Sequence, residues 1–277
     1  MYKEGKWANQ ILELQDNEGK WGCFHSLSQF YDAPMTTEQA LRRLEILGYT
    51  MKDACIQNAV SYMEDCLYGR KIIPDRREKV SDWDVFSRLI LATWVRRFTN
   101  ECYIANQVAE QWAEVITSAF SLGYYDESCY QASYRHVLSP QYGRINGFAM
   151  FYPVSLLRGC LDEQTERLMV SYLLNCNEGI YYIYDRKLMC VPACFESREA
   201  SRYLGAVELL ADYPTARNQL WFVADWLNSH RNSNGRWDMG KSVNDKVYFP
   251  LSDDWRRREV REFDCTVRIE RLLHKIC

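Results

Sequence analysis

Two aspartates with one residue between them stand just before a stretch with helical spacing. Asp82 and Asp84 flank Trp83, and the apolar residues that follow predict a helix over residues 84–98. A carboxyl group here could act as an acid only where dry, apolar surroundings raise its pKa. The alternative is structural: Asp82 or Ser81 caps the helix, and the helix dipole lowers the pKa of Asp84 instead.

Two further polar residues are candidates for contact with a ligand. His25 is one of only four histidines and follows the first glycine-containing turn, and Glu196 stands at the start of a predicted helix. Each also has a structural interpretation. His25 could be a core or surface histidine with its hydrogen bonds satisfied, and Glu196 fits a salt-bridge pattern at helical spacing.

Metal-binding residue types are present without the spacing that a metal site needs. The tight pairs are Cys190 with Cys194 and Cys23 with His25, and neither has a second pair at zinc-finger spacing. The eleven cysteines are an odd number scattered through helical segments, which is typical of reduced thiols rather than of a disulfide framework. We therefore expect no metal site and no cofactor.

The charge balance and hydropathy limit the partners. The formal net charge is −3, from 34 basic and 37 acidic residues, and neither end of the chain is strongly basic. Nucleic-acid binding is not expected, because it needs a concentrated basic surface. The sequence contains no run of about 18 apolar residues, so no transmembrane segment is predicted. The N-terminus lacks the apolar core of a signal peptide, so a cytoplasmic protein is expected.

The elements that would position these residues follow a repeat marked by glycines. The repeat glycines lie 50 to 56 residues apart, and all but Gly69 have an aromatic residue two positions later. They are Gly19, Gly69, Gly123, Gly179 and Gly235. A glycine suits the left-handed turn that closes the C-terminus of a helix, so each is predicted to follow one.

Each interval accommodates two predicted helices. The helices that end near a glycine are expected over residues 7–15, 54–68, 102–122, 163–176 and 216–230. The helices that follow are expected over residues 38–47, 84–98, 152–160, 197–213 and 263–276. A helix pair cannot bury its apolar face alone, so the copies must stack.

Stacked helix pairs can form an open solenoid or a closed ring. Solenoids of the HEAT and armadillo kind have shorter repeats, of about 40–47 residues. The longer repeats here, with polar loops and Trp after the glycine, favour a closed double ring. We therefore predict an all-α protein, an α/α toroid of about five helix-pair repeats, as a single domain over residues 1–277.

The first repeat carries a recognisable motif. Gln15-x3-Gly19-x-Trp21 resembles the QW motif of squalene–hopene cyclases and other members of the terpene cyclase/protein prenyltransferase superfamily. A degenerate copy at the other end has Arg231 at the Gln position and Trp237 at the Trp position. The resemblance implies that Gln15, Trp21 and Trp237 are structural, since QW residues fasten helix ends in that superfamily.

The same resemblance suggests chemistry that the sequence matches incompletely. Class II terpene cyclases protonate an alkene with the middle Asp of a D-x-D-D motif, which places Asp84 at the acid and Asp82 at the first position. The fourth position is Val85, where the family has Asp. Motifs for magnesium–diphosphate and prenyltransferase zinc chemistry are also broken, the first of them at Arg257.

Three functions remain open. The first is a terpenoid-type enzyme that holds an apolar isoprenoid substrate against aromatic walls such as Trp94, Tyr152 and Tyr182, whose faces would stabilise a carbocation. The second is a non-catalytic toroid that binds a ligand or a protein partner, a second copy of the chain included. The third is an enzyme of unrelated chemistry, for example a glycan-processing enzyme with two carboxylates facing each other across a cleft.

Overall fold

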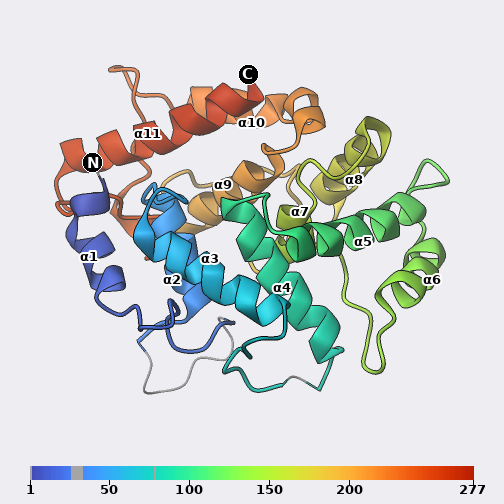
Figure 1. Cartoon of the computed structure of the whole chain (residues 1–277). Helices are drawn as coiled ribbons and strands as arrows, with labels where there is room; N and C mark the ends of the chain where they lie inside the picture. The colour runs from blue at the N-terminus through green and yellow to red at the C-terminus, as the bar shows by residue number, and fades with distance from the viewer. Residues whose placement is uncertain (1, 26–33, 78) are drawn as a thin grey trace. The chain divides into compact units, whose positions relative to one another are not determined.

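The regular secondary structure of the described residues consists of helices (Figure 1). The computed structural model describes residues 2–25, 34–77 and 79–277. Within these ranges there is no β-strand, only isolated bridges that pair Met150 with Tyr181 and Ile180 with Tyr184. The predicted all-α class is therefore confirmed.

The helices gather into two compact units. Unit 1 comprises Met1–Ala119, Asp126–Phe148 and Ser155–Cys160. Unit 2 comprises Phe120–Tyr125, Ala149–Val154 and Leu161–Cys277. The ring and the single domain over residues 1–277 stay predictions.

Unit 1 contains the helices of the N-terminal half of the chain. They are α1 (Lys6–Leu12), α2 (Thr37–Ile46), α3 (Ala54–Leu67), α4 (Trp83–Phe98), α5 (Tyr103–Ala119) and α6 (Glu127–Leu138). Helix α4 packs against both α3 and α5, and α5 packs against α6. Helix α2 begins with a complete capping box, in which Thr36 and Gln39 each accept a hydrogen bond from the other's backbone N–H.

Unit 2 contains the remaining helices. They are α8 (Glu163–Asn175), α9 (Arg198–Leu210), α10 (Trp221–Ser229), α11 (Arg258–Ile276) and the 3-10 turns η3 (Pro214–Gln219) and η4 (Lys241–Val243). Helix α10 packs against α11, and η3 packs against α8 and α11. Helix α7 (Phe151–Leu156) contributes residues to both units.

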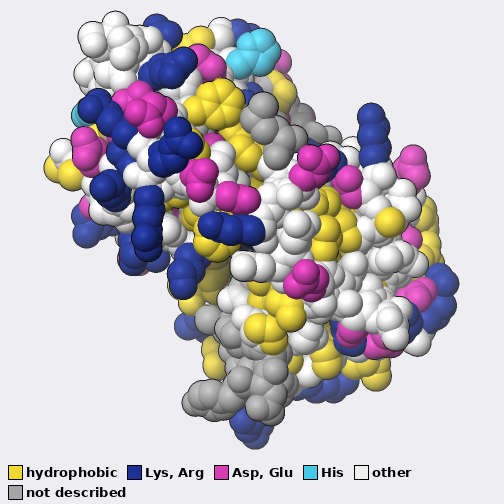
Figure 2. All heavy atoms as spheres, turned by 90° about the vertical axis from the view of Figure 1, so that its left-hand side faces the viewer, with side chains coloured by type: hydrophobic (Ala, Val, Ile, Leu, Met, Phe, Trp, Pro, Cys, Tyr) yellow, Lys and Arg dark blue, Asp and Glu magenta, His cyan; other side chains and the backbone are white. Residues whose placement is uncertain are grey.

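The surface is charged with both signs. On the face in Figure 2, Lys and Arg side chains are interspersed with Asp and Glu, most densely at the upper left of the view. None of the helices in the described ranges has the length and apolar content that a membrane span needs.

The glycine repeat is confirmed in its backbone geometry. All five glycines have positive φ: Gly19 (93°), Gly69 (73°), Gly123 (82°), Gly179 (61°) and Gly235 (74°). Each follows a helix, in order α1, α3, α5, α8 and α10. Of the five, Gly69 directly follows a helix C-cap, whereas the other four lie further along the loop after their helix. The repeat therefore marks a recurring left-handed position in the loop after a helix, and not in every case the residue that closes the helix.

The third repeat differs from its prediction. Helix α6 is an additional helix, begun by Asp126, whose carboxylate accepts from the Cys129 N–H at 2.7 Å. Its only buried residues are Tyr130 and Tyr134, so the aliphatic spacing that predicts a helix is absent. The helix predicted over 152–160 is the short α7.

Two other boundaries also shift. The predicted 216–230 helix is divided into η3 and α10, which begins at Trp221. Helix α11 begins at Arg258, five residues before the predicted start. Its first turns are rich in Arg and Glu, yet Arg261 and Glu262 are buried there, which an apolar pattern cannot reveal.

The turn after α1 is tied to two helices by Trp21. The indole Nε1–H donates to the Ile11 carbonyl in the last turn of α1, at 2.7 Å. The Trp21 backbone N–H donates to Thr37 Oγ1 at the start of α2, at 2.9 Å. The Ile11 carbonyl also accepts from the Leu14 N–H at 3.1 Å, so the buried indole is a second donor at the end of the helix. We call this arrangement the N-terminal clasp.

Gln15 extends the N-terminal clasp to a third helix. Its side-chain amide donates to Gly19 O at 2.9 Å, which holds the turn, and to Cys55 O in the first turn of α3 at 2.8 Å. One side chain therefore connects the turn after α1 to the helix that opens the next repeat.

The same bonds recur at the other end of the chain, in the C-terminal clasp. The Trp237 Nε1–H donates to Leu227 O in α10 at 2.6 Å, and the Trp237 N–H donates to Thr266 Oγ1 in α11 at 3.2 Å. Arg231 replaces Gln15: its Nε–H donates to Gly235 O at 2.8 Å, and its guanidinium lies 5.0 Å from the Trp237 ring centre. Arginine therefore keeps the donor and adds a cation–π contact.

The C-terminal clasp predicts a specific cost for losing the indole N–H. Trp237→Phe keeps an aromatic ring but removes the indole donor, while the Leu227 carbonyl keeps its bond from the His230 N–H at 3.1 Å. Loss of this hydrogen bond and of part of a side chain that is only 1% exposed should lower the free energy of unfolding in urea by about 1–3 kcal/mol. The control Trp221→Phe changes a side chain that is 64% exposed and should change stability by less than about 0.5 kcal/mol. Equal effects of the two substitutions would contradict a fastening role.

Two of the glycines separate the effect of positive φ from that of crowding. A Cβ at Gly69 would meet nothing within 4 Å, whereas a Cβ at Gly179 would lie 2.3 Å from the Tyr184 carbonyl oxygen. Gly69→Ala should cost about 1 kcal/mol through its backbone conformation alone. Gly179→Ala should cost clearly more, and thermal denaturation of both variants measures the difference. If Gly69→Ala lowered the stability as much as Gly179→Ala, the close approach of Gly179 to the Tyr184 carbonyl would be shown to be unimportant.

Candidate functional site

The start of α4 is organised by the carboxylate of Asp82. Asp82 is the N-cap residue, and its Oδ1 accepts from the N–H groups of Asp84 at 3.0 Å and Val85 at 3.1 Å. These are two of the four N–H groups that lack a partner at the beginning of any α-helix. The carboxylate is therefore an acceptor that completes the helix end.

The second oxygen of Asp82 makes a long-range bond. Its Oδ2 accepts from the Gln141 N–H at 2.7 Å, and the residue is only 3% exposed. Burial raises the pKa of Asp82, but the hydrogen bonds from the backbone N–H groups of Gln141, Val85 and Asp84 outweigh it, so the pKa lies below its ordinary value. A group with these surroundings is ionised at neutral pH.

The segment that carries Gln141 is fastened along the same edge of unit 1. The Trp83 N–H donates to the Tyr142 hydroxyl at 3.1 Å, and the Arg144 N–H donates to Val80 O at 2.9 Å. Gly143 lies so close that a Cβ there would be 2.8 Å from the Val80 oxygen. These bonds fix the chain just after α6 against the start of α4.

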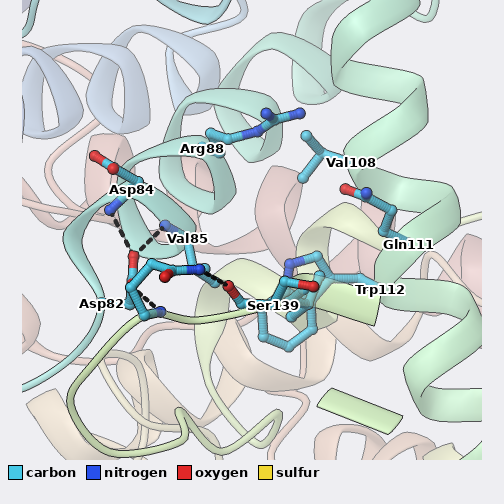
Figure 3. Close-up of a pocket in the computed structure, with 10 residues that line it drawn as sticks. Asp82, Asp84, Val85, Arg88, Val108, Gln111, Trp112 and Ser139 are labelled. Carbon is cyan, nitrogen blue, oxygen red and sulfur yellow. Dashed lines mark hydrogen bonds between the residues drawn. The ribbon is translucent and has the colours of Figure 1, made fainter. Parts of the chain in front are cut away.

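This junction encloses one side of a pocket of about 190 Å³ (Figure 3). Its walls come from α4, α5 and the end of α6 with the residues after it. They are Asp82, Asp84, Val85, Arg88, Val108, Gln111, Trp112, Leu138, Ser139 and Gln141. Trp112 is 1% exposed and packs edge-on against Tyr134, so it forms the floor rather than an open stacking surface.

The polar side chains at the rim are available to a ligand. In Figure 3, Arg88 reaches from α4 toward Val108 and Gln111 of α5. Both Arg88 and Gln111 are exposed, and neither side chain forms a hydrogen bond or ion pair with the described residues. Ser139 sits at the pocket in a left-handed conformation with φ of 47°, held by the Gln141 amide, which donates to its carbonyl at 3.0 Å.

Asp84 does not have the surroundings that a proton donor to an alkene needs. It is exposed, and in Figure 3 its carboxylate points away from the α5 side of the pocket. Dry, apolar surroundings are what keep a carboxylic acid protonated at neutral pH. Neither Asp84, which faces solvent, nor Asp82, which binds three N–H groups, is in such surroundings.

The other candidates from unit 1 lie in its core. His25 is fully buried. Its backbone N–H donates to Asp75 Oδ2 at 2.7 Å, and its ring packs edge-on against Phe86. Trp94 is also 0% exposed, and its indole N–H donates to Glu38 Oε1 at 3.3 Å. Neither residue lines the pocket.

The candidates from unit 2 do not line this pocket either. Tyr152 is 0% exposed and meets the half-buried Tyr182 edge-on at 5.4 Å between ring centres. Tyr182 has φ of 74°, which is uncommon for a bulky residue. Glu196 is exposed, and its carboxylate lies over Gly240, where a Cβ would be 2.7 Å from Oε2.

The expected structural residues Gln15, Trp21 and Trp237 occupy the two clasps described above. Within the described ranges, no three His, Cys, Asp or Glu side chains are grouped closely enough to hold a metal ion. The arrangement can bind, but it does not display an assembled acid–base pair.

Most of the residues that line the pocket cannot be predicted from the sequence. Arg88 was detectable in principle, because it follows Asp84 by four residues and shares its helix face. Ser139 and Gln141 were not, because they depend on α6 and on bonds between residues 59 positions apart. Gln111 and Trp112 are part of a predicted helix, but nothing in their spacing indicates that they face α4.

Comparisons with known proteins add no information about this site. No family model matches the chain, and neither a curated protein nor a solved structure does.

The Asp82 bonds predict a pH-dependent contribution to stability. Asp82→Ala should lower the free energy of unfolding at pH 7 by about 1–2 kcal/mol. Because the folded-state pKa lies below the ordinary value of 3.8, the wild-type advantage is present above that value and is lost as the pH falls through the lower folded-state pKa. Urea denaturation from pH 7 to pH 2 measures it.

Asp162 provides the matched control for this experiment. It caps α8 through the N–H groups of Gln164 and Thr165 and accepts from the Thr165 hydroxyl, but it makes no bond to a distant segment within the described ranges. Asp162→Ala should therefore cost less than Asp82→Ala. A difference between wild type and Asp82→Ala that persists unchanged below pH 3 would show that the carboxylate charge is not involved.

Proposed function

We propose that the chain is a non-catalytic helical protein that binds a small ligand in the pocket at the start of α4. The observation that carries this proposal is the division of roles among the pocket's charged groups. Asp82 is fully used by the fold, with three backbone N–H groups on its carboxylate, whereas Arg88 and Gln111 have no partner among the described residues. Groups at a concave site without protein partners are available for recognition.

The proposed architecture is an α/α toroid related to the terpene cyclase/protein prenyltransferase superfamily. It is supported by the left-handed glycines at near-constant intervals and by matching clasps at Trp21 and Trp237. Two clasps with the same three kinds of hydrogen bond favour a common repeating unit over a coincidental turn. Such a fold hosts many functions, so it carries no reaction with it.

The two enzymatic alternatives have weaker support. A polyprene cyclase needs a protonated acid and an aromatic-lined cavity, while Asp84 is exposed and Trp94 and Tyr152 are completely buried. A glycan-processing enzyme needs two carboxylates that face each other across the substrate. The carboxylate of Asp82 is directed at backbone N–H groups, and that of Asp84 is exposed and points away from the α5 side of the pocket.

An activity assay and a binding screen test this function together. The wild-type protein should not turn over polyprenes such as squalene, and Asp84→Asn should behave like wild type. A small-molecule screen by thermal shift should find ligands that stabilise the wild type. Their effect should disappear in Gln111→Trp, which fills the pocket mouth, but not in Glu114→Trp, which alters an exposed residue on the same helix outside the pocket.

Turnover of a polyprene that is abolished by Asp84→Asn would overturn the non-catalytic proposal and restore the cyclase. Stabilising ligands that act equally on wild type and Gln111→Trp would place binding elsewhere in the protein.

A further inference from the structure

The cation at the pocket rim has no anionic partner among the described residues. The Arg88 guanidinium comes from the second turn of α4 and forms no ion pair or hydrogen bond with the described residues. By contrast, Arg97 of the same helix makes two bonds to Glu45, at 2.8 and 2.7 Å. The fork of a guanidinium matches a carboxylate in this two-bond manner.

A second donor faces the same space. The Gln111 amide comes from α5, and Figure 3 shows Arg88 reaching toward that helix. An amide can donate one hydrogen bond to an anion that the guanidinium holds. The two side chains are on separate helices, so a small group bound between them would connect α4 and α5.

The pocket lining also contains apolar side chains. Val85, Val108, Trp112 and Leu138 form the hydrocarbon part of the lining. Val108 and Trp112 are almost completely buried, so the floor belongs to the packed core and is preformed. Burying hydrocarbon against such a floor contributes about 25 cal/mol per Å².

Two carboxylates of the protein oppose an anionic ligand only weakly. The charge of Asp82 is balanced by three N–H groups, two of them at the positive end of the α4 dipole. Asp84 is exposed and points away from the α5 side, so water and salt screen its charge. Asp84 should therefore weaken the binding of an anion slightly without preventing it.

We propose that the pocket takes a small organic carboxylate with an apolar body; this inference rests on the binding function proposed above. The carboxylate would bind Arg88 and Gln111, and the hydrocarbon would cover Val108 and Trp112. The volume of about 190 Å³ is below the roughly 300–1,000 Å³ of pockets for drug-sized ligands. The ligand is therefore a short-chain acid rather than a long polyprene.

Calorimetric titration with hexanoate and hexanamide tests the inference on the intact chain. The two probes share a hydrocarbon body and differ in charge. The wild-type protein should bind hexanoate at least ten-fold more tightly than hexanamide. Arg88→Gln should lose at least ten-fold in hexanoate affinity with little change for hexanamide. Arg88→Lys, which keeps the charge without the fork, should lie between the two.

The flanking residues give signed controls. Asp84→Asn should tighten hexanoate binding by up to a few-fold, because it removes a like charge near the ligand. Arg135→Gln removes an exposed cation of α6 outside the pocket and should leave both affinities unchanged. Circular dichroism of each variant confirms that it is folded.

The outcomes separate this inference from the function on which it rests. Equal affinity for the two probes, or hexanoate binding that survives Arg88→Gln, overturns the carboxylate specificity. If uncharged molecules bind instead and Gln111→Trp abolishes their binding, the pocket function stands and the ligand class is wrong. If neither probe binds and no screened ligand responds to Gln111→Trp, both proposals fail.

Discussion

The hydrogen bonds of one carboxylate set the geometry on which the pocket depends. The Asp82 carboxylate accepts hydrogen bonds from two backbone N–H groups of α4. It accepts a third from the backbone N–H of Gln141, 59 residues later in the chain. An unsatisfied N–H at a buried helix end costs free energy comparable to a lost hydrogen bond. Because the same carboxylate satisfies both partners, the start of α4 and the segment after α6 hold each other in place. The pocket walls between them follow from that bond.

The clasps apply the same constraint to the opposite ends of helices. Where Asp82 supplies an acceptor to N–H groups, Trp21 and Trp237 supply indole donors to carbonyls in the last turns of α1 and α10. Each tryptophan also donates its backbone N–H to a threonine hydroxyl of another helix. Satisfying helix ends with side chains from other elements therefore both completes the helices and determines which of them are neighbours.

The sequence was informative where a residue type is required by backbone geometry. The repeat glycines could be predicted to have positive φ, because only glycine adopts it at little cost. The helices that precede these glycines could then be predicted as well. Helix α6 was missed because its buried face consists of Tyr130 and Tyr134 without an aliphatic stripe. The early start of α11 was missed because Arg261 is buried through a two-bond pair with Asp238, a contact that no local pattern encodes.

The candidate site was less predictable than the fold for the same reason. Asp82 and Asp84 could be singled out from their types and spacing, but their roles depend on where the Gln141 N–H lies and on which way each carboxylate points. Aromatic residues chosen as cavity walls, Trp94 and Tyr152, are core residues, because bulky apolar side chains serve packing and pockets alike. Arg88 stands out only in the structure, where its side chain lines the pocket and has no partner among the described residues.

The central claim is that Asp82 is an ionised structural acceptor and not an acid. A titration of the side-chain carboxyl carbons by nuclear magnetic resonance, with Asp82→Asn used to assign the signal, tests it most directly. The account predicts that the Asp82 signal titrates with a pKa below the ordinary carboxyl pKa of 3.8. It also predicts that the signal of the Gln141 backbone amide proton shifts in the same transition. An Asp82 carboxyl that remains protonated near neutral pH would contradict the account and make acid chemistry at the start of α4 credible again.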